Sequence, residues 1–249
     1  MSAVDLRAAI RAKFEKELTG YEKLLAKADE LFDRNQAKAF LDTTRPSTGA
    51  VLGLYTKARK GVAALHVLAT SGYGEDAMII ARSLVNLCID LGYICRTDSD
   101  DRARQWIARG RVSRREMAQA FGLTPPDEVT VDWGKVGERA RAWKAVRIFD
   151  RAKDAGLENF YEIAYRHGCV YEHSDAWGAL AYLDIVDDSI DMRSEPSPTR
   201  VDTALLAGAF ALGEIASISG KYWGFDIAQA DREIFDLVMT AFRKSDASS

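Results

Sequence analysis

The chain has 249 residues, of which 47% are hydrophobic and 29% are charged, with five prolines, 18 glycines and a formal net charge of −3. This composition excludes intrinsically disordered, collagen-like and low-complexity chains and is typical of a soluble globular protein. The small net charge gives no overall attraction to nucleic acid or to an anionic membrane. A chain of this length buries a core large enough to fold without a metal or a disulfide.

Apolar residues recur at intervals of three and four along most of the chain, and this period predicts helices. Pro46 and Ser47 can begin a helix, and the short turn at Ser71–Gly74 implies that the helices on either side form an antiparallel pair. In chain order, we expect helices over residues 4–34, 48–70, 75–95, 99–121, 134–154, 157–173, 199–222 and 228–243.

The segment 178–198 allows two interpretations, a small β-hairpin near 180–193 or a frayed helix followed by a loop. The expected fold class is therefore all-α, a multi-helix bundle of about seven to eight helices with that hairpin as an option. No internal repeat or clean linker divides the chain. We expect one helical domain over residues 1–249, with N-terminal helices (2–70), a core that holds the candidate site (75–177) and C-terminal helices (199–243).

The three cysteines, Cys88, Cys95 and Cys169, form no pairing framework, which indicates reduced thiols. The stretch Met1–Phe14 is charged and lacks the apolar core of a signal peptide, so we expect a cytoplasmic protein. The sequence has no CxxC pair, HExxH motif or phosphate-binding glycine loop, and no metal or cofactor is predicted.

Charge is unevenly distributed. Residues 102–153 carry 13 Lys and Arg against 6 Asp and Glu, a balance of +7, whereas residues 154–195 carry 2 against 10, a balance of −8. The two segments can neutralise each other in the fold. Alternatively, helix 99–121 builds a basic face, because Arg104, Arg111 and Arg115 fall on one side of it.

A polar stripe runs along the most apolar predicted helix. Arg82, Asn86 and Asp90 are spaced by four, which places them on one face of a helix too polar to be a membrane span. Unpaired polar groups are costly to bury, so the stripe needs partners. Arg166 and His173, about 700° apart on a helix, share a face and are the predicted partners. The pair of stripes is either an enclosed polar site or a hydrogen-bond network that fixes helix register.

The Arg-x6-His spacing of Arg166 and His173, with His167 directly after the arginine, resembles the HEPN superfamily of all-helical proteins. Many HEPN proteins are metal-independent ribonucleases whose sites are formed by two chains. The resemblance implies that His173 exchanges protons with the ribose 2′-hydroxyl or the leaving oxygen, and that Arg166 holds the phosphate. It also implies that His167 shares the acid–base work and that Asn86 supports the pair from an earlier helix. Asp90 is the alternative supporting residue, and Arg82 lies on the same stripe.

A second resemblance covers roughly residues 60–180. The segments ARSLVNLCIDLGYI (81–94) and YRHGCVYEHSDAW (165–177) are similar to a bacterial all-helical family of unknown function. A second Arg-x6-His match, Arg59 to His66, lies in a plain amphipathic helix, and we interpret His66 as a packing residue.

Two functions remain open at this point. The first is a non-catalytic ligand-binding or scaffold module with a buried polar site, and the alternative is a HEPN-like endoribonuclease that uses Arg166 and His173. We expect a homodimer, with RNA or a nucleotide as candidate ligands, no membrane partner and no DNA-binding motif. The candidate binding residues near the motif are Tyr171, Glu172, Ser174 and Trp177.

Overall fold

The computed structural model describes residues 3–39, 44–124, 131–166, 168–169, 182–186, 189–192 and 195–242. The helices before the strands are α1 (Ala3–Lys13), α2 (Glu15–Ala39), α3 (Pro46–Thr70), α4 (Gly74–Arg96), α5 (Ser99–Ala120), α6 (Trp133–Ala145), α7 (Ile148–Ala155), α8 (Glu158–Phe160) and the π-helical turn η1 (Tyr161–Tyr165). Strands β1 (Leu183–Val186) and β2 (Ser189–Met192) and helices α11 (Val201–Tyr222) and α12 (Ala228–Phe242) follow.

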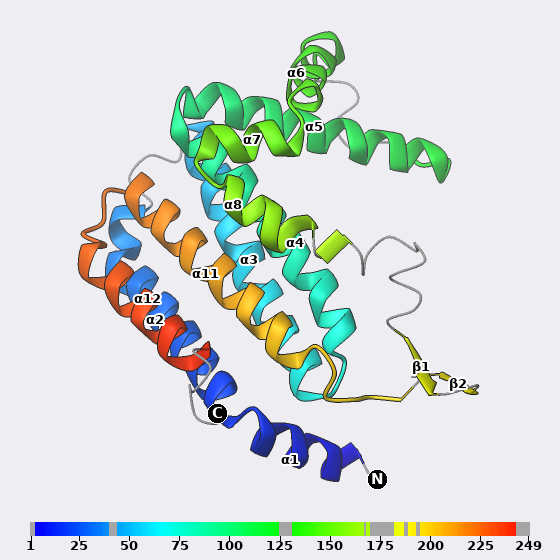
Figure 1. The fold of residues 1–249 in the computed structure, drawn as a ribbon. Coiled ribbons are helices and arrows are strands. Elements are labelled where there is room, and N and C mark those ends of the chain that lie inside the picture. Colours follow the sequence, from blue (N-terminus) through cyan, green and yellow to red (C-terminus); the bar gives the residue numbers. More distant parts are fainter. Residues whose placement is uncertain are drawn as a thin grey trace.

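The centre of the fold is formed by α3, α4 and α11, with α11 packed along both of the others. Helices α2 and α12 lie against each other on one side of this core, α7 lies against α4, and α5 crosses one end with α6 on it (Figure 1). Gly208 lets α11 approach closely, because a Cβ atom there would lie 2.8 Å from a methyl group of Leu65 and from the hydroxyl of Tyr21. One apolar cluster therefore joins helices from both ends of the chain.

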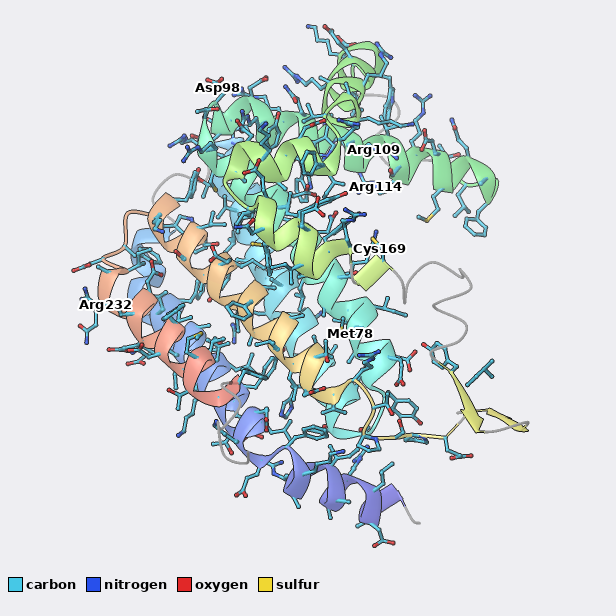
Figure 2. The ribbon with its side chains drawn as sticks, in the orientation of Figure 1. Met78, Asp98, Arg109, Arg114, Cys169 and Arg232 are labelled. Carbon is cyan, nitrogen blue, oxygen red and sulfur yellow. The ribbon has the colours of Figure 1, made fainter. Side chains whose placement is uncertain are left out.

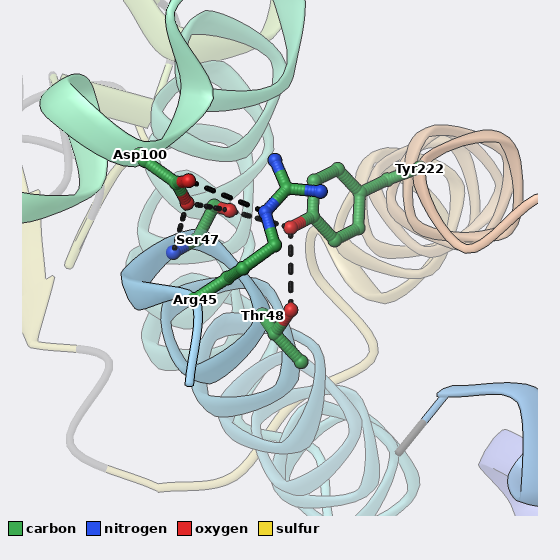
Figure 3. Close-up of polar contacts among 5 residues, drawn as sticks. All are labelled: Arg45, Ser47, Thr48, Asp100 and Tyr222. Atoms are coloured by element: carbon green, nitrogen blue, oxygen red, sulfur yellow. Dashed lines mark hydrogen bonds and ion pairs between the residues drawn. The ribbon is translucent and has the colours of Figure 1, made fainter. Parts of the chain in front are cut away.

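A polar cluster joins three helix ends (Figure 3). The Asp100 carboxylate accepts hydrogen bonds from the Ser47 hydroxyl and, at 3.2 Å, from the Ser47 backbone N–H, while Arg45 Nε lies 3.2 Å from its other oxygen. Ser47 Oγ also lies 2.5 Å from the Tyr222 hydroxyl, which is 3.4 Å from that of Thr48. The hydrogen bond from Ser47 lowers the pKa of Asp100 most. The cluster thus ties the starts of α3 and α5 to the end of α11.

The all-α class is confirmed, but the expected seven to eight helices are too few, since the described residues form ten α-helices. The predicted helix 4–34 is divided at Phe14, although backbone hydrogen bonds still run from Phe14 to Ile10 and from Leu18 to Phe14. The predicted helix 134–154 is divided because Val146 and Arg147 adopt extended backbone angles, which turn α7 away from α6.

The segment between η1 and α11 contains the two strands. They pair antiparallel, with Leu183 opposite Met192 and Ile185 opposite Ile190. After them, Ser197 bridges to Tyr73 in parallel fashion, and the Ser197 N–H donates to the Gly72 carbonyl at 2.8 Å. This contact brings the start of α11 to the start of α4.

Helices α4 and α11 are long and apolar enough to cross a membrane, judged by length and composition alone. Both also form the centre of the core, where a soluble protein needs helices of the same composition. The length and composition of these two helices are therefore weak evidence for a membrane span.

Candidate functional site

Arg82, the first residue of the predicted stripe, joins α4 to the segment that contains the motif. Its Nε donates to Cys169 Sγ at 3.1 Å and its Nη2 donates to the Tyr165 hydroxyl at 2.9 Å. The guanidinium carbon also lies 4.6 Å from the centre of the Tyr165 ring, a cation–π geometry. Cys169 lies in Figure 2 at the end of this segment, beside α4.

Gly168 makes this close approach of the segment to α4 feasible. A Cβ atom at Gly168 would lie 2.6 Å from the Cβ of Arg82, a distance at which one of the two backbones has to shift. On the other side, the Tyr165 ring stacks on Tyr161 at 5.0 Å, and Tyr161 meets the edge of Phe149 in α7 at 5.3 Å. The π-helical turn is therefore held between α4 and α7.

Arg166 projects from this anchored segment into solvent. Its side chain is 66% exposed, and its Nη1 donates to Glu162, one turn earlier, at 2.7 Å. That hydrogen bond is the main cause that raises the pKa of the Arg166 guanidinium. Among the described residues, no contact joins Arg166 to Asn86 or Asp90, so the stripe does not meet it there.

Asp90, the last residue of the stripe, is buried and faces Arg151 of α7. The Asp90 carboxylate lies 3.4 Å from Arg151 Nε, and both side chains are largely shielded from solvent. The Arg151 guanidinium stacks on Trp143 with its carbon 4.6 Å from the ring centre. Burial raises the pKa of Asp90 to about 6, whereas Arg151 and Lys57 act in the opposite direction.

Arg102, which the sequence did not link to the stripe, likewise binds a carboxylate and stacks on an aromatic ring, at the end of α4. Arg102 Nη1 donates to the Tyr93 carbonyl and to Asp154, both at 2.6 Å, and its guanidinium lies 3.9 Å from the centre of the Tyr93 ring. Tyr93 meets Trp143 edge-on at 5.5 Å. No local spacing joins these residues, because they come from α4, α5, α6 and α7. The result is one network of arginines and aromatic rings along α4.

The predicted stripe is thus engaged at both ends by structural contacts. Arg82 binds the η1 segment and Asp90 binds α7, while Asn86 lies half-buried on α4 between them. The remaining predicted site residues lie outside the described residues: His167, Tyr171, Glu172, His173, Ser174 and Trp177.

The second Arg-x6-His match occupies ordinary packing positions. His66 stacks on Tyr21 at 5.9 Å, and its Nε2 lies 3.4 Å from Glu22, while Arg59 pairs with Asp29. Within the described part of the chain, no group of three or more His, Cys, Asp or Glu side chains is arranged to hold a metal ion.

Comparison with known proteins places this site within a family. The model of a family of unknown function, DUF5677, matches residues 48–191, which is more than half of the chain. No curated protein and no solved structure matches. The matched segment includes α4, with its polar stripe, and Arg166.

Proposed function

Because the chain belongs to the DUF5677 family, whose function is unknown, we propose its function from the geometry. We propose a non-catalytic helical module that binds the phosphate of a nucleotide or of RNA at Arg166. The observation that carries this proposal is that Arg82 fixes the η1 segment on α4 and leaves the Arg166 guanidinium exposed. A planar, permanently charged guanidinium on a rigid support suits phosphate recognition.

The contacts that Arg82 and Asp90 make within the fold favour a phosphate site on the surface over one buried between the helices. Arg82 and Asp90 already have partners in the fold, so their charges are used to hold neighbouring helices. Arg166 has Glu162 as its ion-pair partner, and both side chains are accessible to solvent. An exposed ion pair of this kind contributes little stability, so a phosphate can displace the carboxylate at low cost.

A thermal-shift series with nucleoside mono-, di- and triphosphates and short oligoribonucleotides tests this proposal. A ligand at a hundred times its dissociation constant stabilises the protein by about 2.7 kcal/mol. Arg166→Gln is expected to abolish the shift. The matched control is Arg147→Gln, because Arg147 is also exposed and pairs with a carboxylate three residues away, that of Asp150. Equal shifts in wild type and Arg166→Gln would refute a phosphate site at Arg166.

The second candidate is a metal-independent endoribonuclease of the HEPN type. It is favoured by one observation, that α4 supports the segment bearing Arg166 through Arg82, four residues before Asn86, from which the resemblance expects support. In this alternative, His173 acts as the acid–base group and Arg166 stabilises the phosphate in the transition state, with His167 assisting. Loss of RNA cleavage in folded His173→Ala and Arg166→Ala variants would support it, and unchanged cleavage would exclude it.

We also propose that the protein is a cytoplasmic homodimer formed through the outer face of α11 and α12. The groove between these helices has a volume of about 520 Å³ and is lined by Phe210 and Phe235, which are both exposed. Glu214 and Arg232 also line it, so a second copy related by a two-fold axis can match apolar to apolar and acid to base. The three cysteines are free thiols, as a reducing compartment requires.

Light scattering at high micromolar concentration tests the dimer. Phe235→Asp is expected to give monomers because it places a charge in the proposed interface. Met117→Asp is the matched control, since Met117 is equally exposed but lies on α5. A monomeric wild-type protein would contradict the proposal.

A further inference from the structure

Helices α5 and α6 form an arm whose base packs on the main core and whose outer part extends away from it. They are joined by their own small apolar cluster, in which Ala108 of α5 meets Val136 and Ala140 of α6. The C-terminal half of α5 extends beyond the helices of the core, and α6 stands on it (Figure 1). At 22 residues, α5 is about 33 Å long. The arm therefore offers an elongated, accessible surface.

Helices α5 and α6 are more basic than the rest of the molecule. Together they carry 10 Lys and Arg against 4 Asp and Glu, a balance of +6, so the rest of the chain, with a total of −3, has a balance of −9. Within the described structure, the neighbouring acidic segment pairs with the arm at its base, where Arg102 binds Asp154. The side chains labelled on α5 in Figure 2 include Arg109 and Arg114.

Several cations of the arm are exposed and have no acidic partner among the residues that the structure describes. Arg109 has a distant one, Glu116 at 3.8 Å. Across the described residues, no ion pair involves the following five side chains, all of which are exposed: Arg104, Arg111, Arg139, Arg141 and Lys144. Arg104 and Arg111 are two turns apart and so share one face of α5. Four of the five are arginines, which match the geometry of phosphate oxygens.

The end of the arm adds an apolar and aromatic surface. Phe121 is 75% exposed, and Met117 and Leu123 are exposed to a similar degree. Proteins that bind single strands combine a cationic track for the backbone with aromatic side chains on which unpaired bases stack. Phe121 follows Arg111 by ten residues along the same helix axis, so one strand can contact both.

We propose that the α5–α6 arm binds single-stranded nucleic acid, with its arginines on the phosphates and Phe121 under a base. The proposal is independent of the phosphate site at Arg166, which lies on a different element. The acidic remainder of the molecule keeps other surfaces away from the polyanion and orients the arm towards it.

Fluorescence anisotropy with a labelled 20-nucleotide oligouridylate tests this proposal on the full chain. If these five exposed cations all contact phosphates, the affinity falls about a hundred-fold between 50 and 200 mM KCl, because each contact contributes about −0.7 to the logarithmic salt slope. The double variant Arg104→Gln/Arg111→Gln is expected to make this slope shallower by about 1.4. Phe121→Ala is expected to weaken binding roughly five-fold or more at every salt concentration, because it removes stacking and no charge.

The matched control is Arg7→Gln/Lys60→Gln, which removes the same charge from exposed positions on α1 and α3. It is expected to leave the salt slope unchanged. The side chains changed in these variants are all exposed, so each variant is expected to fold. Circular dichroism spectra that match the wild type are the check on folding. A wild-type slope in the α5 double variant would overturn the proposal, as would the absence of binding at about 100 µM protein and 50 mM KCl. Sedimentation with phosphatidylglycerol vesicles, but no binding of the oligonucleotide, would assign the arm to an anionic membrane instead.

Discussion

Asp90 gives the free energy of unfolding a defined dependence on pH. Burial raises its pKa to about 6 in the folded protein, compared with an ordinary value of 3.8. Folding therefore favours the protonated acid, and this contribution to stability is fully present below pH 3.8 and is lost as the pH rises through about 6. Since each pH unit between these values corresponds to 1.36 kcal/mol, the full contribution is about 3 kcal/mol.

Asp90→Asn isolates this term, because asparagine keeps the shape of the side chain and does not titrate. We expect the stability of the wild type, measured relative to Asp90→Asn by urea unfolding, to fall by about 2 kcal/mol between pH 4.5 and 7.5. A constant difference over that range would refute the reasoning. Because Arg151 opposes the effect of burial on Asp90, Arg151→Gln is expected to shift the midpoint of the pH-dependent difference to higher pH.

Three further predictions concern other contacts. Gly168→Ala is expected to lower the melting temperature because it pushes the η1 segment away from α4. Its control is Gly110→Ala in α5, where a Cβ atom meets nothing within 4 Å, and this change is expected to raise stability by about 0.5–1 kcal/mol. Equal effects of the two substitutions would contradict the close approach at Gly168. Ser47→Ala is expected to cost about 1–3 kcal/mol in denaturant unfolding, since the Asp100 carboxylate loses its hydroxyl donor, and a loss well below this range would mean that water replaces the serine. In native thiol labelling with iodoacetamide followed by mass spectrometry, Cys169 is expected to react before the two other cysteines, whose pKa values are raised by burial; a different order would contradict the packing of α4.

The sequence predicted helix boundaries correctly where a proline or a glycine-containing turn marks them. Pro46 begins α3, and the turn at Ser71–Gly74 separates α3 from α4 within a residue or two of the expected ends. Asp98, a residue type that often caps helices, does not cap α5. Its backbone is in the left-handed region, with φ 47°, and its side chain caps nothing, whereas Asp100 caps the start of α3 instead. A cap between two helices depends on tertiary packing and has no signature in local sequence.

The polar stripe on α4 followed from its spacing, but its partners did not. That Arg82 and Asp90 need partners is a consequence of burial, and both have them. Arg151 reaches Asp90 only because the helix breaks at Val146–Arg147 and α7 turns onto α4. The sequence-based hypothesis continued that helix without a break, so it had no means of bringing Arg151 to the stripe.

The packing of α11 has a consequence for how the family is to be understood. The segment shared with the family, residues 48–191, ends before α11 begins at Val201, yet α11 packs along both α3 and α4 at the centre of the core. On its own, the shared segment would expose the apolar surface that α11 covers, and it would associate or unfold in water. Each relative that has this segment therefore has to cover the same surface, either with a later helix of its own sequence or with a second chain.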